Sequence, residues 1–147
     1  MSTSWVVVHL LLFLALADFA LSKSFFTRWF DEQFPTYTVH ITSGIRSPVW
    51  CHCKSGDYDL GEHQLNRNEE FYFQFKSNIF RSTRFFCSCR WPKRNKFASF
   101  DVFNAAKLFR AVHCFDGLDC FWKLRSAGIY ASQDGGKNYT YKMYEWQ

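Results

Sequence analysis

Apolar and polar residues alternate along most of the chain after residue 35. Val39 and Ile41 alternate with polar neighbours, and the clearest run places Phe71, Phe73 and Phe75 on one side. Because residues two apart in a strand point to the same face of a sheet, these runs predict half-buried strands. The same alternation predicts further strands at residues 49–54, 84–91, 97–103 and 120–125.

Near the C-terminus the pattern predicts a hairpin. Residues 129–133 form its first strand, Asp134-Gly135-Gly136 its turn, and Tyr139, Tyr141 and Met143 its second strand. About seven to eight short strands with frequent turns predict an all-β fold, a small antiparallel β-sandwich. Residues 105–112 are rich in helix formers and fit either one turn of helix or an extended connection, so this stretch stays open.

The first residues have a different pattern. Residues 6–21 are almost wholly apolar, and their unbroken run, 10–17, is shorter than the roughly 20 residues that span a bilayer. Ala20-Leu21-Ser22 offers small residues for cleavage, which predicts a secretory signal peptide at 1–22 and a single extracellular domain at 23–147. An uncleaved anchor is the alternative, because no Lys or Arg precedes the apolar run.

The segment that follows carries aromatic residues at helical spacing. Phe25, Phe26, Trp29 and Phe30 recur over 23–34, and Pro35 ends the pattern. We interpret this segment as a leader or short helix packed on the core. A membrane-touching amphipathic turn is the alternative.

Six cysteines follow the apolar segment: Cys51, Cys53, Cys87, Cys89, Cys114 and Cys120. In an exported protein such a set predicts a disulfide framework. Each Cys-x-Cys pair projects from one face of its strand, so bridges between two sheets, or to Cys114 and Cys120, are all conceivable. The sequence alone does not choose among the pairings.

A zinc site is the alternative use of these cysteines, with His52 and His113 as further ligands. Structural zinc sites separate their cysteines by two or more residues, whereas one residue separates each pair here. An oxidising compartment also disfavours free thiolates. We therefore expect no metal and no cofactor.

The composition is basic and lacks known catalytic motifs. The net charge is +5, and residues 1–22 contain one acid and no base, so the mature part is more basic still. Such a charge favours anionic partners such as cell-wall polymers, membrane surfaces or acidic proteins. Gly-x-Ser-x-Gly, His-Glu-x-x-His and phosphate-binding glycine motifs are absent from the sequence. Two histidines could cleave RNA, but the spacing of the four mature histidines brings no two together: His40, His52, His63 and His113.

Three polar stretches remain. The acids between Asp57 and Glu70 lie among turn residues, which favours solvated turns over a calcium or glycosidase site. The basic stretch 90–96 favours a solvated recognition loop over a nucleic-acid patch. Asn138-Tyr139-Thr140 is an acceptor for N-glycosylation, and its place beside a turn predicts that Asn138 is exposed and carries a glycan.

Several motifs in order resemble the plant self-incompatibility S-protein family. They are Val39-His40-Ile41, His52-Cys53-Lys54-Ser55 with Asp57 to Gly61, the aromatic run 71–75, Thr83 to Trp91, Phe100-Asp101-Val102-Phe103, Cys114 with Cys120-Phe121-Trp122, and Gly128-Ile129-Tyr130. The resemblance covers about residues 39–131. It implies a secreted, disulfide-stapled β-sandwich without known catalytic activity. In the best-understood members it implies a stigma ligand that pollen detects through a membrane receptor.

The chain departs from the family pattern at a few positions. The four family cysteines correspond to Cys53, Cys87, Cys114 and Cys120, so Cys51 and Cys89 are additional. The resemblance then implies an added bridge between Cys51 and Cys89, which needs Cα atoms about 4.4–6.8 Å apart.

We expect a secreted, monomeric recognition ligand without catalysis. Its partner would be a receptor on a plant cell surface, with no nucleic acid and no stable membrane insertion after cleavage. A secreted defence protein acting on membranes or cell walls is the first alternative, and a secreted ribonuclease the second. Because strand residues are committed to the core, we expect the contacts in loops: 43–48, 56–63, 92–96 and 116–119.

Overall fold

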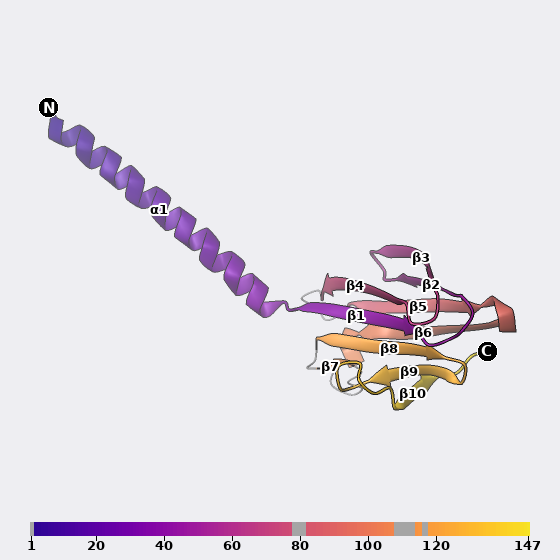
Figure 1. Ribbon diagram of the computed structural model, residues 1–147. Coiled ribbons are helices and arrows are strands. Elements are labelled where there is room, and N and C mark those ends of the chain that lie inside the picture. Colours follow the sequence, from indigo (N-terminus) through magenta and orange to yellow (C-terminus); the bar gives the residue numbers. More distant parts are fainter. Residues whose placement is uncertain (1, 78–81, 108–113, 116–117) are drawn as a thin grey trace. The chain divides into compact units, whose positions relative to one another are not determined.

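The computed structural model describes residues 2–77, 82–107, 114–115 and 118–147 of the chain (Figure 1). These residues form two compact units, Met1–Pro35 and Thr36–Gln147. One helix, α1 (Ser2–Gln33), forms most of the first unit, so residues 23–33 of the aromatic segment are the last part of a longer helix. No helix among the described residues combines the length and hydropathy of a membrane span. Cleavage after residue 22 stays a prediction.

The second unit is built from short strands. Its described residues form ten strands and two 3₁₀ helices: β1 (Thr36–Ser43), β2 (Val49–Lys54), β3 (Asp59–Leu65), β4 (Glu70–Lys76), β5 (Arg84–Trp91), η1 (Pro92–Arg94), β6 (Lys96–Asn104), η2 (Ala105–Lys107), β7 (Cys114–Phe115), β8 (Asp119–Arg125), β9 (Gly128–Ser132) and β10 (Tyr141–Tyr144).

These strands pair into two sheets. The larger sheet has the order β10-β9-β8-β1-β4, with β7 paired to β8, and the smaller sheet has the order β3-β2-β5-β6. Every neighbouring pair is antiparallel except β1 and β8, which run parallel with Val39 beside Cys120. A parallel pair needs a long crossover, and here the whole smaller sheet lies between β1 and β8 in the chain.

The all-β, two-sheet prediction is confirmed, with three differences of detail. The parallel pair departs from a purely antiparallel sandwich. Two strands were not predicted: β3, whose residues are mostly polar because it is a sheet edge, and β7, which has two residues. For residues 105–112 the sequence did not decide between a helical turn and an extended connection. Ala105–Lys107 forms a 3₁₀ turn, and residues 108–112 lie outside the described part.

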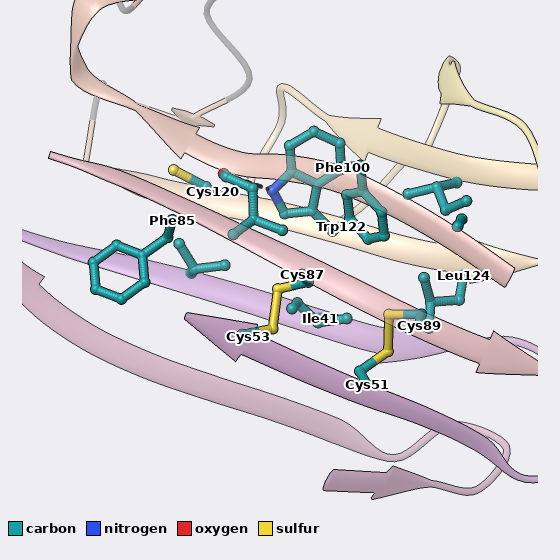
Figure 2. Close-up of a cluster of buried hydrophobic side chains, with 14 of the residues drawn as sticks. Ile41, Cys51, Cys53, Phe85, Cys87, Cys89, Phe100, Cys120, Trp122 and Leu124 are labelled. Carbon is teal, nitrogen blue, oxygen red and sulfur yellow. Dashed lines mark hydrogen bonds between the residues drawn. A yellow bond between two sulfur atoms is a disulfide. The ribbon is translucent and has the colours of Figure 1, made fainter. Parts of the chain in front are cut away.

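The core lies between the two sheets and consists of the inward half of each alternating strand. Phe73 and Phe75 of β4 meet Phe85 of β5, with ring centroids 5.0 and 4.5 Å apart. Trp122 of β8 is 1% exposed, and its indole Nε1 donates to the Val102 carbonyl of β6 at 3.0 Å (Figure 2). That bond satisfies the polar atom of a buried tryptophan and ties the two sheets together.

All six cysteines form disulfides, and each disulfide stays within one sheet. Cys51–Cys89 and Cys53–Cys87 join β2 to β5 side by side (Figure 2). Cys114–Cys120 joins β7 to β8. In the first two bridges the Cα atoms are 4.1 and 4.0 Å apart, just below the expected range and close to the narrow spacing of antiparallel neighbours. Two conceivable pairings are therefore wrong: bridges between the sheets, and bridges from the Cys-x-Cys pairs to Cys114 or Cys120. The layers are held together by apolar packing and by the hydrogen bond from Trp122 to Val102.

Candidate recognition surface

The outer face of the larger sheet carries stacked aromatic rings. His40 of β1 stands in register with Tyr72 of β4 on one side and Phe121 of β8 on the other. The imidazole lies 4.5 Å from the Phe121 ring at an interplanar angle of 9°, and 5.9 Å from the Tyr72 ring. Tyr72 is 61% exposed, so this row ends in an aromatic ring open to solvent.

Two cations extend the same face toward β9. The Arg125 guanidinium lies 4.8 Å from the Tyr130 ring and 5.9 Å from the Tyr139 ring. Lys123 Nζ lies 5.2 Å from the Tyr139 ring. All three distances fall within the reach of a cation–π interaction. We call these seven residues the aromatic face: His40, Tyr72, Phe121, Lys123, Arg125, Tyr130 and Tyr139.

The loop between β9 and β10 folds over this sheet and delivers Tyr139 to it. Arg125 Nη1 donates to the Tyr139 carbonyl at 3.2 Å, and the Tyr139 hydroxyl bonds to Thr42 of β1. Gly136 has φ +80° and passes so close that a Cβ would lie 3.0 Å from the Phe121 ring. Only glycine combines that backbone angle with that approach, so Gly136 seats the loop on the face.

A polar turn fixes the base of the loop. The backbone N–H of Asn138 donates to one carboxylate oxygen of Asp134 at 2.8 Å, and its side-chain amide donates to the other at 2.7 Å. Hydrogen bonds from Ser132 and Asn138 lower the pKa of Asp134 to about 2. The carboxylate therefore stays charged over the whole physiological range and holds the loop in one conformation.

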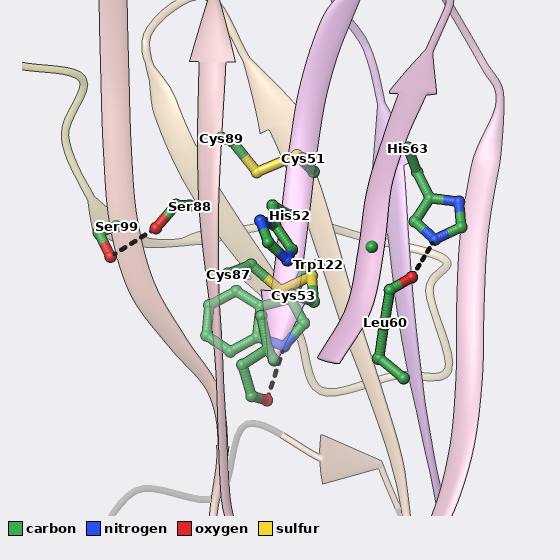
Figure 3. Close-up of a disulfide and its surroundings, with 12 residues drawn as sticks. Cys51, His52, Cys53, Leu60, His63, Cys87, Ser88, Cys89, Ser99 and Trp122 are labelled. Atoms are coloured by element: carbon green, nitrogen blue, oxygen red, sulfur yellow. Dashed lines mark hydrogen bonds between the residues drawn. A yellow bond between two sulfur atoms is a disulfide. The ribbon is translucent and has the colours of Figure 1, made fainter. Parts of the chain in front are cut away.

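The outward face of the smaller sheet is different, because its polar side chains largely satisfy one another. His52 of β2 bonds to Asp59 of β3, and this bond lowers the pKa of Asp59. Arg90 pairs with Glu62, and the Ser88 and Ser99 hydroxyls lie 3.2 Å apart (Figure 3). These paired groups support the sheet and leave few unsatisfied side chains for a partner.

The structure does not unite the histidines considered for catalysis. His40 and His52 lie on the outward faces of different sheets, and His63 stacks on Phe71 with its Nε2 2.8 Å from the Leu60 carbonyl (Figure 3). His113 lies outside the described residues. Among the residues that are described, no group of three or more His, Cys, Asp and Glu is placed to hold a metal.

The predicted contact loops are only partly loops. Residues 43–48 and 92–96 connect strands, but Asp59–Leu65 is strand β3, so the prediction of a loop over 56–63 is wrong for its second half. The loop at 116–119 lies partly outside the described residues. The aromatic face itself was missed, because it consists mainly of outward-facing strand residues. The signal was present in the alternation, which places His40, Tyr72 and Phe121 opposite the core.

The fold defines a small disulfide-bonded β-sandwich, and comparison with known families identifies its class. The model of the family described as plant self-incompatibility protein S1 matches residues 38–146. The chain therefore belongs to this family, as the motifs predicted.

Relatives of known name agree with this membership. S-protein homolog 5 of Arabidopsis thaliana is 38% identical over 81 residues, which span 55% of this chain but only 58% of that relative. S-protein homolog 2 of the same plant is 33% identical over 79% of this chain and 73% of its own length. Self-incompatibility protein S1 of Papaver rhoeas is 29% identical over 80% of this chain and 78% of its own length.

A solved structure supports the fold. It is that of a self-incompatibility protein homologue, and it matches with a TM-score of 0.54 at 20% identity, over 78% of this chain and 95% of that one. That protein is described as one of a widespread family of small, highly stable, secreted plant proteins. The prediction of a secreted, extracellular protein is thereby confirmed at the level of the family.

Proposed function

We propose that this protein is a non-catalytic recognition ligand that binds a receptor on a plant cell through the aromatic face. The observation that carries the proposal is the in-register stack of Tyr72, His40 and Phe121 beside Arg125. Tyrosine and arginine are enriched among the residues that dominate protein–protein binding energy. The Papaver rhoeas relative is named a self-incompatibility protein, so pollen–pistil rejection is one form that such signalling would take.

The active form in this proposal is residues 23–147, released after cleavage of the signal peptide at residue 22. It acts as a monomer, because a homodimer formed through the aromatic face would hide the surface that the receptor needs. It requires no cofactor, metal or nucleic acid, and it does not insert into membranes. The family is not known for enzymes, which agrees with a binding role.

Receptor binding is tested with the fluorescently labelled protein, secreted by expressing plant cells and applied to protoplasts from several tissues. We expect saturable binding to some cell types, displaced by excess unlabelled protein and retained at physiological salt. Surface charges are screened beyond about 8 Å at that ionic strength, so purely electrostatic adsorption would weaken. Equal, non-saturable binding to all cells would contradict a receptor.

We further propose that Asn138 is glycosylated. Asn138 and Thr140 of the acceptor are exposed, and the loop that carries them lies on the same side of the sheet as the aromatic face. We expect the secreted protein to lose the mass of one N-glycan on treatment with a peptide N-glycosidase, and the Asn138→Gln variant to lack that mass from the start. An unchanged mass after treatment would contradict this proposal. Loss of saturable binding in Thr140→Ala, which removes the acceptor but keeps the hydrogen bonds between Asn138 and Asp134, would show that the glycan also contributes to recognition.

A further inference from the structure

One end of the β-sandwich carries exposed cations on three connections, which are every second connection from β1 to β6. Arg46 lies between β1 and β2, Arg67 between β3 and β4, and Lys93 and Arg94 between β5 and β6 (Figure 1). Among the described acidic residues, none forms an ion pair with these four cations. Their charge is therefore available to a partner.

Hydrogen bonds hold these connections against one another. The Asn68 N–H donates to the Ser43 carbonyl at 2.7 Å, and the Ser43 N–H donates to the Glu69 carbonyl at 3.0 Å. Trp91 Nε1 donates to the Ser47 hydroxyl at 2.7 Å, which joins the end of β5 to the β1–β2 connection. Bound partners therefore meet loops that are already ordered, which reduces the entropy lost on binding.

The β5–β6 connection is fixed in further ways. Asn95 adopts a left-handed conformation with φ 50°, and its N–H donates to the Pro92 carbonyl at 3.0 Å. The Arg94 guanidinium lies 6.0 Å from the Trp91 ring, and Trp91 packs against Trp146. These contacts position the loop backbone while its charged groups stay exposed.

Acidic groups at this end are engaged elsewhere. Glu69 accepts hydrogen bonds from the backbone and side chain of Asn66, which lowers its pKa. Glu145 pairs with Lys142 at 2.7 Å. The end thus presents a positive surface that neighbouring carboxylates do not neutralise by direct pairing.

We propose that this basic end binds an extracellular polyuronate, a linear sugar chain with a carboxylate on each residue. The cations follow the strand order β3-β2-β5-β6, so they extend over about 14 Å at the usual spacing of strands instead of converging on one point. A row of separate charges fits an extended anion with repeated carboxylates better than a single phosphate. Secretion places the protein among such polymers.

A membrane surface fits this end less well. Stable binding to lipid needs apolar side chains that enter the interface as well as basic residues. Among the described residues of these connections, Phe97 at the start of β6 is the one large apolar side chain with high exposure, at 53%. The polyuronate is therefore the preferred partner, and this inference does not rest on the proposed receptor.

Binding is measured by calorimetry with polygalacturonate, and with the fully methyl-esterified polymer as the uncharged control. We expect binding to the first polymer only. The K93Q/R94Q variant should bind about tenfold more weakly, as expected when two exposed ion pairs of ordinary strength are lost. The matched variant K54Q/K137Q removes the same charge from two exposed residues, Lys54 at the last position of β2 and Lys137 in the connection between β9 and β10, and should change the affinity little.

Three results would overturn the inference: equal weakening by both variants, binding to the methyl-esterified polymer, or tighter binding to phosphatidylglycerol vesicles than to polygalacturonate. Thermal unfolding of both variants must match that of the parent protein, which exposed substitutions allow. The K93Q/R94Q variant should still bind saturably to cells. Calorimetry therefore tests the polyuronate inference, and cell binding separately tests the proposed receptor.

Discussion

Removing both cross-strand disulfides of the smaller sheet should destabilise the protein by about 6 kcal/mol, about 2 kcal/mol more than twice the effect of removing one. In the chain-entropy model, Cys53–Cys87 closes a loop with a sequence separation of 34. A loop of that length contributes about 4 kcal/mol to the free energy of unfolding. Once it is closed, Cys51–Cys89 closes only a small additional ring, which contributes about 2 kcal/mol.

Either bridge alone therefore closes the long loop and keeps most of the stabilisation that the two bridges give together. The variants C51A/C89A and C53A/C87A should each lower the free energy of unfolding by about 2 kcal/mol, and the effect of the quadruple variant should exceed their sum by about 2 kcal/mol. Denaturant unfolding, with the midpoint and slope fitted together, measures this difference. The C114A/C120A variant serves as the control, because its bridge lies in the other sheet and its effect should simply add. Plain additivity of the two bridges would contradict the shared-loop argument.

The same two bridges show what the sequence could determine. Alternation around the Cys-x-Cys pairs predicts strands 49–54 and 84–91 with the bounds that the structure has. Their pairing depends on the register between β2 and β5, which sets Cys51 opposite Cys89 and Cys53 opposite Cys87. A shift of one residue would turn one strand's cysteines to the other face. Local alternation does not contain that register, so the disulfide pairing stayed open until the resemblance implied one bridge.

The aromatic face was harder to foresee for a related reason. The alternation states that His40, Tyr72 and Phe121 point away from the core, but not that their strands are neighbours. These residues come together only because β1 pairs with β4 on one side and, in parallel, with β8 on the other. Strand β3 was missed because it contains charged residues and Gly61, a composition typical of turns as well as of protected sheet edges. Gly61 indeed has a positive φ of 76° within the strand.

Substitution of the exposed ring on the aromatic face should abolish most receptor binding. We expect Tyr72→Ala to weaken saturable binding to cells at least about 30-fold, or about 2 kcal/mol, the usual threshold for a dominant interface residue. Tyr72 is 61% exposed, and a cross-strand pair contributes at most about 1 kcal/mol to folding, so the variant should remain folded. Tyr58→Ala is the matched control, because Tyr58 is 65% exposed but precedes β3 in the smaller sheet.

A substitution at Arg125 distinguishes the effect of side-chain shape from the effect of charge at the same surface. Its planar guanidinium lies against Tyr130 and Tyr139 and also donates to the Tyr139 carbonyl, which a lysine ammonium cannot do in the same plane. Arg125→Lys keeps the charge, so electrostatic adsorption would be unaffected by it. If the face binds as a shaped surface, Arg125→Lys should weaken saturable binding along with Tyr72→Ala. Unchanged binding in both variants, with Tyr58→Ala as strong as the parent, would place the receptor contact away from this sheet.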